Sequence, residues 1–103
     1  MKRVINGKVY NTETATLIGG YSNQRPSNDF YFVDEDLYIT KKGSFFIAGA
    51  GGAMTNYAKP VGDATGGGSS IIPLTKAKAL EWAEQHTEAD IIEKYFGEIL
   101  DEA

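Results

Sequence analysis

Three short runs of aromatic and β-branched residues lie close together in the middle of the chain. They are Asp29–Val33 (DFYFV), Leu37–Thr40 (LYIT) and Ser44–Ala48 (SFFIA). Residues of these types favour strands, and the three-residue connections between the runs are too short for a crossover between parallel neighbours. The block therefore predicts a three-strand antiparallel meander, with the acidic segment Asp34–Asp36 at the tip of its first hairpin.

Neither face of this meander is polar. In the first run, Phe30 and Phe32 share one face of the strand, while Tyr31 and Val33 share the other. A sheet that is apolar on both faces has to be covered on both. The pattern predicts helices on one side and loops or a partner on the other, and a homodimer is left open.

The segment before the meander begins with Asn6-Gly7, the strongest two-residue hairpin signal. Strands are expected on either side of it, at Lys2–Ile5 and Lys8–Tyr10. A helix is predicted next, from about residue 12 to residue 21, because three apolar residues share one helical face there. These residues are Leu17, Ile18 and Tyr21.

The segment after the meander predicts two helices. Thr75 is a suitable N-cap for the first, which includes Trp82, and a second begins near residue 87. The second has apolar residues at a spacing of four: Ile91, Tyr95 and Ile99, and Ile92, Phe96 and Leu100. The region Gly62–Ser70 is predicted as a flexible Gly/Ser loop, and residues 97–103 as a frayed acidic tail.

The predicted fold class is α+β in a single domain of residues 1–103. It consists of a small antiparallel sheet, built from the N-terminal hairpin and the three-strand meander. One N-terminal helix and two C-terminal helices complete it.

Composition excludes several function classes. The chain has no cysteine and one histidine, so disulfides, thiol catalysis, thiolate zinc sites and His-rich metal centres are ruled out. No apolar run approaches the roughly 20 residues of a membrane helix, and the N-terminus does not resemble a signal peptide. The composition therefore predicts a soluble, cytosolic protein without membrane contact.

Charge is distributed unevenly along the chain. Residues 1–80 hold nine basic and six acidic residues (net +3), whereas residues 81–103 hold one basic and eight acidic residues (net −7). An acidic end repels nucleic acid, and most of the basic residues are scattered singly. Direct nucleic-acid binding is not predicted. The acidic end serves either solubility alone or competition for a basic groove on a partner.

The glycine-rich stretches invite a nucleotide-binding interpretation, but they lack its essential residues. Gly62 and Gly67 have the spacing of a phosphate-binding loop, yet Gly68 stands where the lysine is required. The run Gly49–Gly52 lacks the third glycine of the dinucleotide fingerprint. We predict no catalytic residue, no cofactor and no metal. An enzyme that uses the glycine loops to act on nucleotides or peptides is kept as an alternative hypothesis.

The predicted partner-binding residues are acids and tyrosines expected at the surface. Acids suit a basic groove, and tyrosines are enriched in binding hot spots. The candidates are Asp34, Glu35 and Asp36 at the hairpin tip, Tyr31, Tyr38 and Tyr57 on the open sheet face, and Glu84, Glu88 and Glu93 on the helices.

Over residues 4–85 the chain resembles a family of small proteins coded by bacteriophages and other mobile elements. The family pattern reads N-G-K-x-Y-[DN]-T-x-T-A, then L-Y-x-T-x-x-G-x-[WF]-F, a G-x-G-G loop, a tyrosine, I-x-P-L-T, and E-W in a helix. The matching positions are Asn6, Gly7, Lys8, Tyr10, Asn11, Thr12, Thr14 and Ala15; then Leu37, Tyr38, Thr40, Gly43, Phe46, Gly49, Gly51, Gly52 and Tyr57; and last Ile71 or Ile72, Pro73, Leu74, Thr75, Glu81 and Trp82.

Some proteins with this pattern are similar to anti-CRISPR and other anti-defence proteins. The resemblance implies a non-enzymatic inhibitor that binds a bacterial defence protein, such as a CRISPR effector or its guide complex, and blocks nucleic-acid binding or cleavage. The alternative is a regulatory interaction module of a mobile element with no defence target. The chain departs from the pattern in the region Gly62–Ser70, where relatives often carry cysteines.

Overall fold

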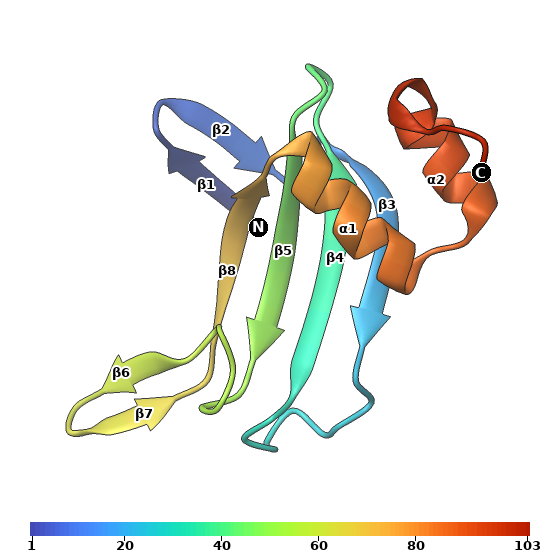
Figure 1. Ribbon diagram of the computed structural model, residues 1–103. Coiled ribbons are helices and arrows are strands. Elements are labelled where there is room, and N and C mark those ends of the chain that lie inside the picture. Colours follow the sequence, from blue (N-terminus) through green and yellow to red (C-terminus); the bar gives the residue numbers. More distant parts are fainter.

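The computed structural model describes all residues, 1–103, and its centre is a four-stranded antiparallel sheet (Figure 1). The strands lie in the order β3-β4-β5-β8, and every neighbouring pair is antiparallel. Their bounds are Thr16–Ser22 for β3, Val33–Ile39 for β4, Phe45–Gly51 for β5 and Gly68–Leu74 for β8.

Two hairpins and two helices complete an α+β fold. The hairpins are β1 (Lys2–Ile5) with β2 (Lys8–Asn11), and β6 (Lys59–Val61) with β7 (Ala64–Gly66). The helices are α1 (Lys76–His86) and α2 (Ala89–Phe96), and a 3₁₀ turn, Gly97–Ile99, follows α2. No helix combines the length and the apolar character needed to cross a membrane.

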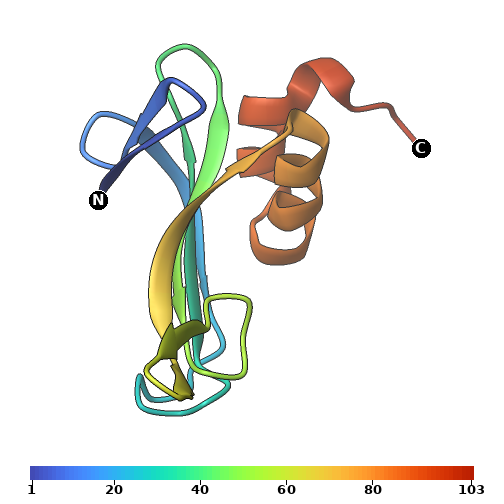
Figure 2. The same ribbon diagram turned by 90° about the vertical axis from the view of Figure 1, so that its left-hand side faces the viewer.

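The two faces of the sheet carry different layers. Figure 2 shows α1 and α2 on one side of the sheet and the β1–β2 hairpin on the other, at the same end. We call these the helix face and the hairpin face. At the opposite end, the hairpin face has no covering element (Figure 2).

The main core lies between the helix face and the helices. Leu37 and Phe96 are fully buried there, and the ring of Phe96 stacks on Phe45 with centroids 5.0 Å apart. Trp82 is also buried, and Ile92 packs against the same cluster. The expected apolar faces of both C-terminal helices are therefore confirmed, although α2 ends at Phe96 and leaves Leu100 outside it.

A second, smaller core lies under the β1–β2 hairpin. Tyr10 meets the fully buried Phe46 edge-on at 5.5 Å, and Ile71 completes the cluster. The ring of Tyr38 also stacks on Phe46, with centroids 5.2 Å apart. The Asn6-Gly7 turn makes this hairpin as expected, with φ of 51° and 77° at its two residues.

The helix predicted over residues 12–21 is wrong, because this segment forms strand β3. A β-bulge between Leu17 and Gly19 inserts one extra residue, so Ile18 and Tyr21 both reach the helix face although they are three apart. In a regular strand, residues three apart point to opposite faces, so two apolar residues at this spacing usually indicate a helix. Here the bulge places them on the same face of a strand. The chain has two helices, not three.

The meander is correct in its second and third strands, which pair as β4 and β5. The first expected strand, Asp29–Val33, is a turn instead, because side chains bond to its backbone. Asp29 Oδ1 accepts the Tyr31 N–H at 2.7 Å, and Asn23 Nδ2 donates to the Tyr31 carbonyl at 2.7 Å. Strand β4 starts only at Val33, so Asp34–Asp36 lies inside a strand and not at a hairpin tip.

The segment 62–70, expected as a loop, contains β7 and the beginning of β8. Pro73 is tolerated in β8 because β8 is an edge strand of the sheet. Thr75 caps α1 as expected, with its Oγ1 accepting the Lys78 N–H at 3.2 Å. The four-stranded sheet carries both cores, one on each of its faces.

Candidate functional site

Three consecutive acids in β4 are divided between the two faces of the sheet, because successive strand residues point to opposite sides. Glu35 lies on the helix face, opposite Tyr21 and Gly49 in the strand register. Asp34 and Asp36 lie on the hairpin face. The sequence placed all three on one hairpin tip, and the structure gives them two separate environments.

Glu35 joins three parts of the molecule through its carboxylate. Its Oε1 accepts the Trp82 Nε1–H from α1 at 3.0 Å, and its Oε2 accepts the Tyr57 hydroxyl from the loop after β5. Both partners are buried. The carboxylate thus connects strand, helix and loop.

Tyr57 is 3% exposed, so it is not available as the surface contact that we expected. Burial, the hydrogen bond to Glu35 and the charge of Glu35 all raise the pKa of its phenol far above 10.0. A Cβ at Gly49 would overlap the Tyr57 hydroxyl, so glycine at that position makes room for the ring. Tyr57 is a structural residue that closes the helix face beyond α1.

The hairpin face beyond the β1–β2 hairpin carries an acidic strip, which we define as Asp34 and Asp36 together with the small residues beside them. In neighbouring strands those residues are Gly20, Ala48 and Ala50. Alternate residues of a strand stand roughly 7 Å apart on one face. Neither carboxylate has a salt bridge or hydrogen bond within the protein.

The acidic strip is electrostatically unfavourable for the fold. Burial, followed by the charge of Asp34, raises the pKa of Asp36 above its usual value of 3.8. Burial, followed by the charge of Asp36, raises the pKa of Tyr38. The uncompensated negative charge is therefore felt by its neighbours across this part of the face.

The remaining predicted residues lie elsewhere. Tyr38 is half-buried, and Tyr31 is 52% exposed in the loop before β4. Glu84, Glu88 and Glu93 are exposed on or next to the helices, so the sheet separates them from the acidic strip. The predicted acids consequently form two surfaces and not one.

An exposed apolar cluster, which the sequence did not single out as a whole, surrounds Tyr31. Phe30 and Met54 are 67% and 61% exposed, and the Met54 N–H donates to the Phe30 carbonyl at 2.8 Å. The guanidinium of Arg25 lies over the Tyr31 ring, 5.6 Å from its centroid. The sequence predicts Phe30 in the first strand of the meander, whereas in the structure it lies in the turn that follows Asp29 and is exposed.

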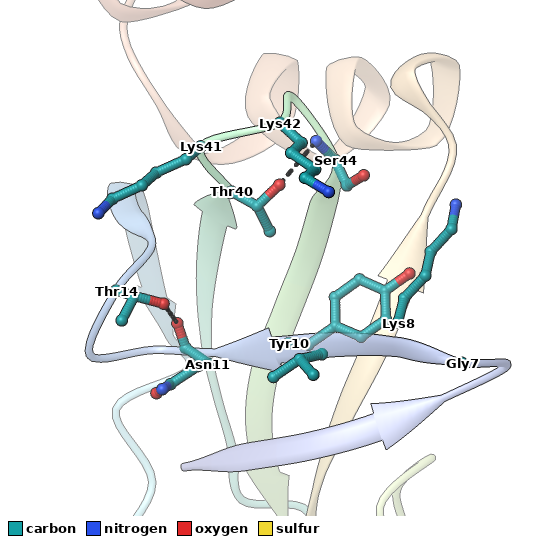
Figure 3. A pocket seen from close by; sticks show the side chains of 10 residues that line it. Gly7, Lys8, Tyr10, Asn11, Thr14, Thr40, Lys41, Lys42 and Ser44 are labelled. Carbon is teal, nitrogen blue, oxygen red and sulfur yellow. Dashed lines mark hydrogen bonds between the residues drawn. The ribbon is translucent and has the colours of Figure 1, made fainter.

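A basic pocket at the other end of the hairpin face was also missed. It lies between β2 and the β4–β5 turn, has a volume of about 640 Å³ and contains three lysines (Figure 3). Its lining residues are Gly7, Lys8, Val9, Tyr10, Asn11, Thr14, Thr40, Lys41, Lys42 and Ser44. The sequence signal was Lys41-Lys42 before Gly43, but nothing local predicts that Lys8 lies near them.

The structure brings no group of three His, Asp or Glu side chains into a metal-binding arrangement. No protein-family model matches the chain, and comparisons with curated proteins and with solved structures found no significant match. The functional argument therefore rests on the acidic strip, the apolar cluster and the basic pocket themselves.

Proposed function

We propose that this chain is a non-enzymatic inhibitor of phage or mobile-element type, acting in the cytoplasm of a bacterial host cell. It binds a defence protein, a CRISPR effector or its guide complex, and blocks nucleic-acid binding or cleavage. The observation that carries the proposal is the acidic strip: two unpaired carboxylates on an uncovered sheet face.

The charge of the strip suits a groove that normally holds phosphates. Effector grooves that bind nucleic acid present lysine and arginine side chains, and carboxylates on a rigid surface compete for those cations. Asp34 and Asp36 lie in a central strand with hydrogen-bonded neighbours on both sides, so their positions are fixed before binding. The small residues beside them let a partner approach closely.

The energetic cost of the strip supports a binding role. An unpaired, partly buried carboxylate destabilises the folded state, and such groups are typical of functional surfaces. The third carboxylate of the segment, that of Glu35, accepts hydrogen bonds from two donors. The lack of partners is therefore specific to Asp34 and Asp36. The choice of target class comes from the sequence pattern over residues 4–85, which resembles that of phage and anti-CRISPR proteins.

A competition assay with purified CRISPR effector complexes of several types tests the proposal. We expect the protein to reduce target-DNA binding or cleavage by at least one complex, and the effect to weaken as salt rises. The variant D34N/D36N should raise the half-inhibitory concentration by tenfold or more. The matched control E84Q/E93Q, which removes the same charge from the helices, should change it less than twofold.

Two results would count against this assignment. Equal losses in both variants would show that net charge, and not the strip, drives binding. Failure to inhibit or bind any effector, together with recovery of a different stable partner, would favour the regulatory module with no defence target. Circular dichroism of both variants checks that each is folded.

A further inference from the structure

The basic pocket holds positive charge that nothing in the protein neutralises. Lys8 comes from β2, while Lys41 and Lys42 come from the β4–β5 turn. Figure 3 shows Lys41 and Lys8 at opposite margins of the pocket, with Lys42 between them. No acidic side chain lines the pocket, and the salt bridges of the structure use other basic residues.

The turn that carries two of these lysines is fixed by its own hydrogen bonds. The Gly43 N–H donates to the Thr40 carbonyl at 2.9 Å, and the Thr40 N–H donates to the Ser44 carbonyl at 2.8 Å. The Ser44 N–H also donates to Thr40 Oγ1 at 3.0 Å. Gly43 has a φ of +88°, which favours glycine. The backbone of Lys41 and Lys42 is therefore preorganised.

Hydrogen-bond donors lie among the lysines. The hydroxyls of Tyr10 and Ser44 make no hydrogen bond within the protein, and both belong to the pocket lining (Figure 3). The ring of Tyr10 is held by its edge-on contact with Phe46. The pocket is thus lined by three lysines and two free hydroxyls. Figure 3 shows the Lys42 ammonium over the pocket, while the exposed side chains of Lys8 and Lys41 extend from its margins.

We propose that this pocket binds a small phosphate-bearing ligand of about the size of a nucleotide. A phosphate group carries close to two negative charges and three acceptor oxygens, which matches several ammonium groups and hydroxyls better than a single carboxylate does. The volume of about 640 Å³ lies within the usual range for small-molecule sites. Val9 and Tyr10 supply an apolar part of the lining for the rest of the ligand.

Isothermal titration calorimetry at low salt tests this proposal, with pyrophosphate, AMP and ATP as probes. We expect heat of binding with at least one probe, and an affinity that rises with the number of phosphates. The variant K41A/K42A should weaken binding by tenfold or more, and Lys8→Ala should weaken it in the same direction. The matched control K2A/K78A removes two lysines outside the pocket and should change affinity less than twofold.

The site is independent of the acidic strip, so D34N/D36N should leave probe binding unchanged. Three outcomes would overturn the proposal. One is the absence of heat with every probe, and another is an equal loss in K41A/K42A and K2A/K78A. The third is an oligonucleotide without a terminal phosphate that binds as tightly as ATP and loses affinity in K41A/K42A, because it would indicate a nucleic-acid backbone instead of a small ligand.

Discussion

The two faces of the central sheet differ in whether their charged side chains have partners within the chain. On the helix face, both carboxylate oxygens of Glu35 accept hydrogen bonds, one from Trp82 and one from Tyr57. On the hairpin face, Asp34 and Asp36 have no partner, and three lysines of the basic pocket have none either. The carboxylate on the helix face is paired within the chain, whereas the charged groups on the hairpin face are left for a binding partner to neutralise.

One strand, β4, contributes both to the stability of the fold and to a surface of unpaired charge. Residues of β4 alternate between the faces, so a single acidic run contributes one structural carboxylate and two surface carboxylates. Helices cover the first face with large apolar side chains, whereas a two-stranded hairpin covers only one end of the second. We therefore expect substitutions on the helix face to change stability, and substitutions on the hairpin face outside its small core to change binding.

The largest effect should come from Phe96→Ala on the helix side. Phe96 is fully buried against Phe45, so its removal leaves a cavity and should lower the free energy of unfolding by about 3–5 kcal/mol. Val4→Ala, on the exposed outer surface of the β1–β2 hairpin, should stay within about 0.5 kcal/mol. Urea denaturation followed by circular dichroism measures both, and similar losses would remove the contrast between the faces.

Glu35→Ala should have the next largest effect. The buried Trp82 indole N–H and Tyr57 hydroxyl would lose their acceptor, which should cost about 3 kcal/mol in unfolding free energy. The neighbouring change Asp34→Ala removes an unpaired carboxylate and should cost less than about 0.5 kcal/mol. Thermal denaturation of the two variants tests the division, and a greater loss in Asp34→Ala would show that the faces are wrongly assigned.

Much of the fold follows from local sequence signals, and the errors have specific causes. The Asn6-Gly7 turn, the pairing of β4 with β5 and the cap at Thr75 were all predicted from short-range chemistry. Strand β3 was not, because its bulge places Ile18 and Tyr21 on one face at a helical spacing. Helix and bulged strand give the same pattern there, and only pairing with β4 distinguishes them.

The candidate sites were less predictable, since they depend on contacts between distant residues. The acids of β4 were recognised, but their division between faces depends on where the strand begins. That boundary is set by the side chains of Asn23 and Asp29, which hold the preceding turn. The basic pocket requires the β1–β2 hairpin, which carries Lys8, to lie across from the turn that carries Lys41 and Lys42, and this follows from packing of the hairpin on the sheet.

Tyr57→Phe should produce a smaller effect that depends on pH. The folded state raises the phenol pKa, so above about pH 10 the unfolded state releases a proton that the folded state keeps. The unfolding free energy should therefore fall as pH rises from 10, by up to about 1.4 kcal/mol per pH unit, and this slope should diminish in Tyr57→Phe. Tyr38→Phe, on the hairpin face, should change the slope less because that ring is partly exposed. Denaturation at pH 9, 10 and 11 measures the slopes, and identical slopes in wild type and Tyr57→Phe would contradict the role given to Glu35.

The smallest effect, Asp36→Asn, has the opposite sign and tests the comparison most directly. The pKa of Asp36 is above 3.8 in the folded state. As pH rises through 3.8, the unfolded state therefore releases the proton of this carboxyl group before the folded state does. The ionised carboxylate then destabilises the fold at neutral pH, and the isosteric amide should stabilise it by about 0.5 kcal/mol, or roughly 2–4 °C in Tm, after solvent screening. The gain should vanish below about pH 3.8, where the carboxyl group is protonated in both states.

A loss of stability at pH 7 would mean that Asp36 has a favourable partner and is not free for recognition. A gain in stability accompanied by a loss of target binding in D34N/D36N would instead identify the strip as charge that the fold carries for a partner.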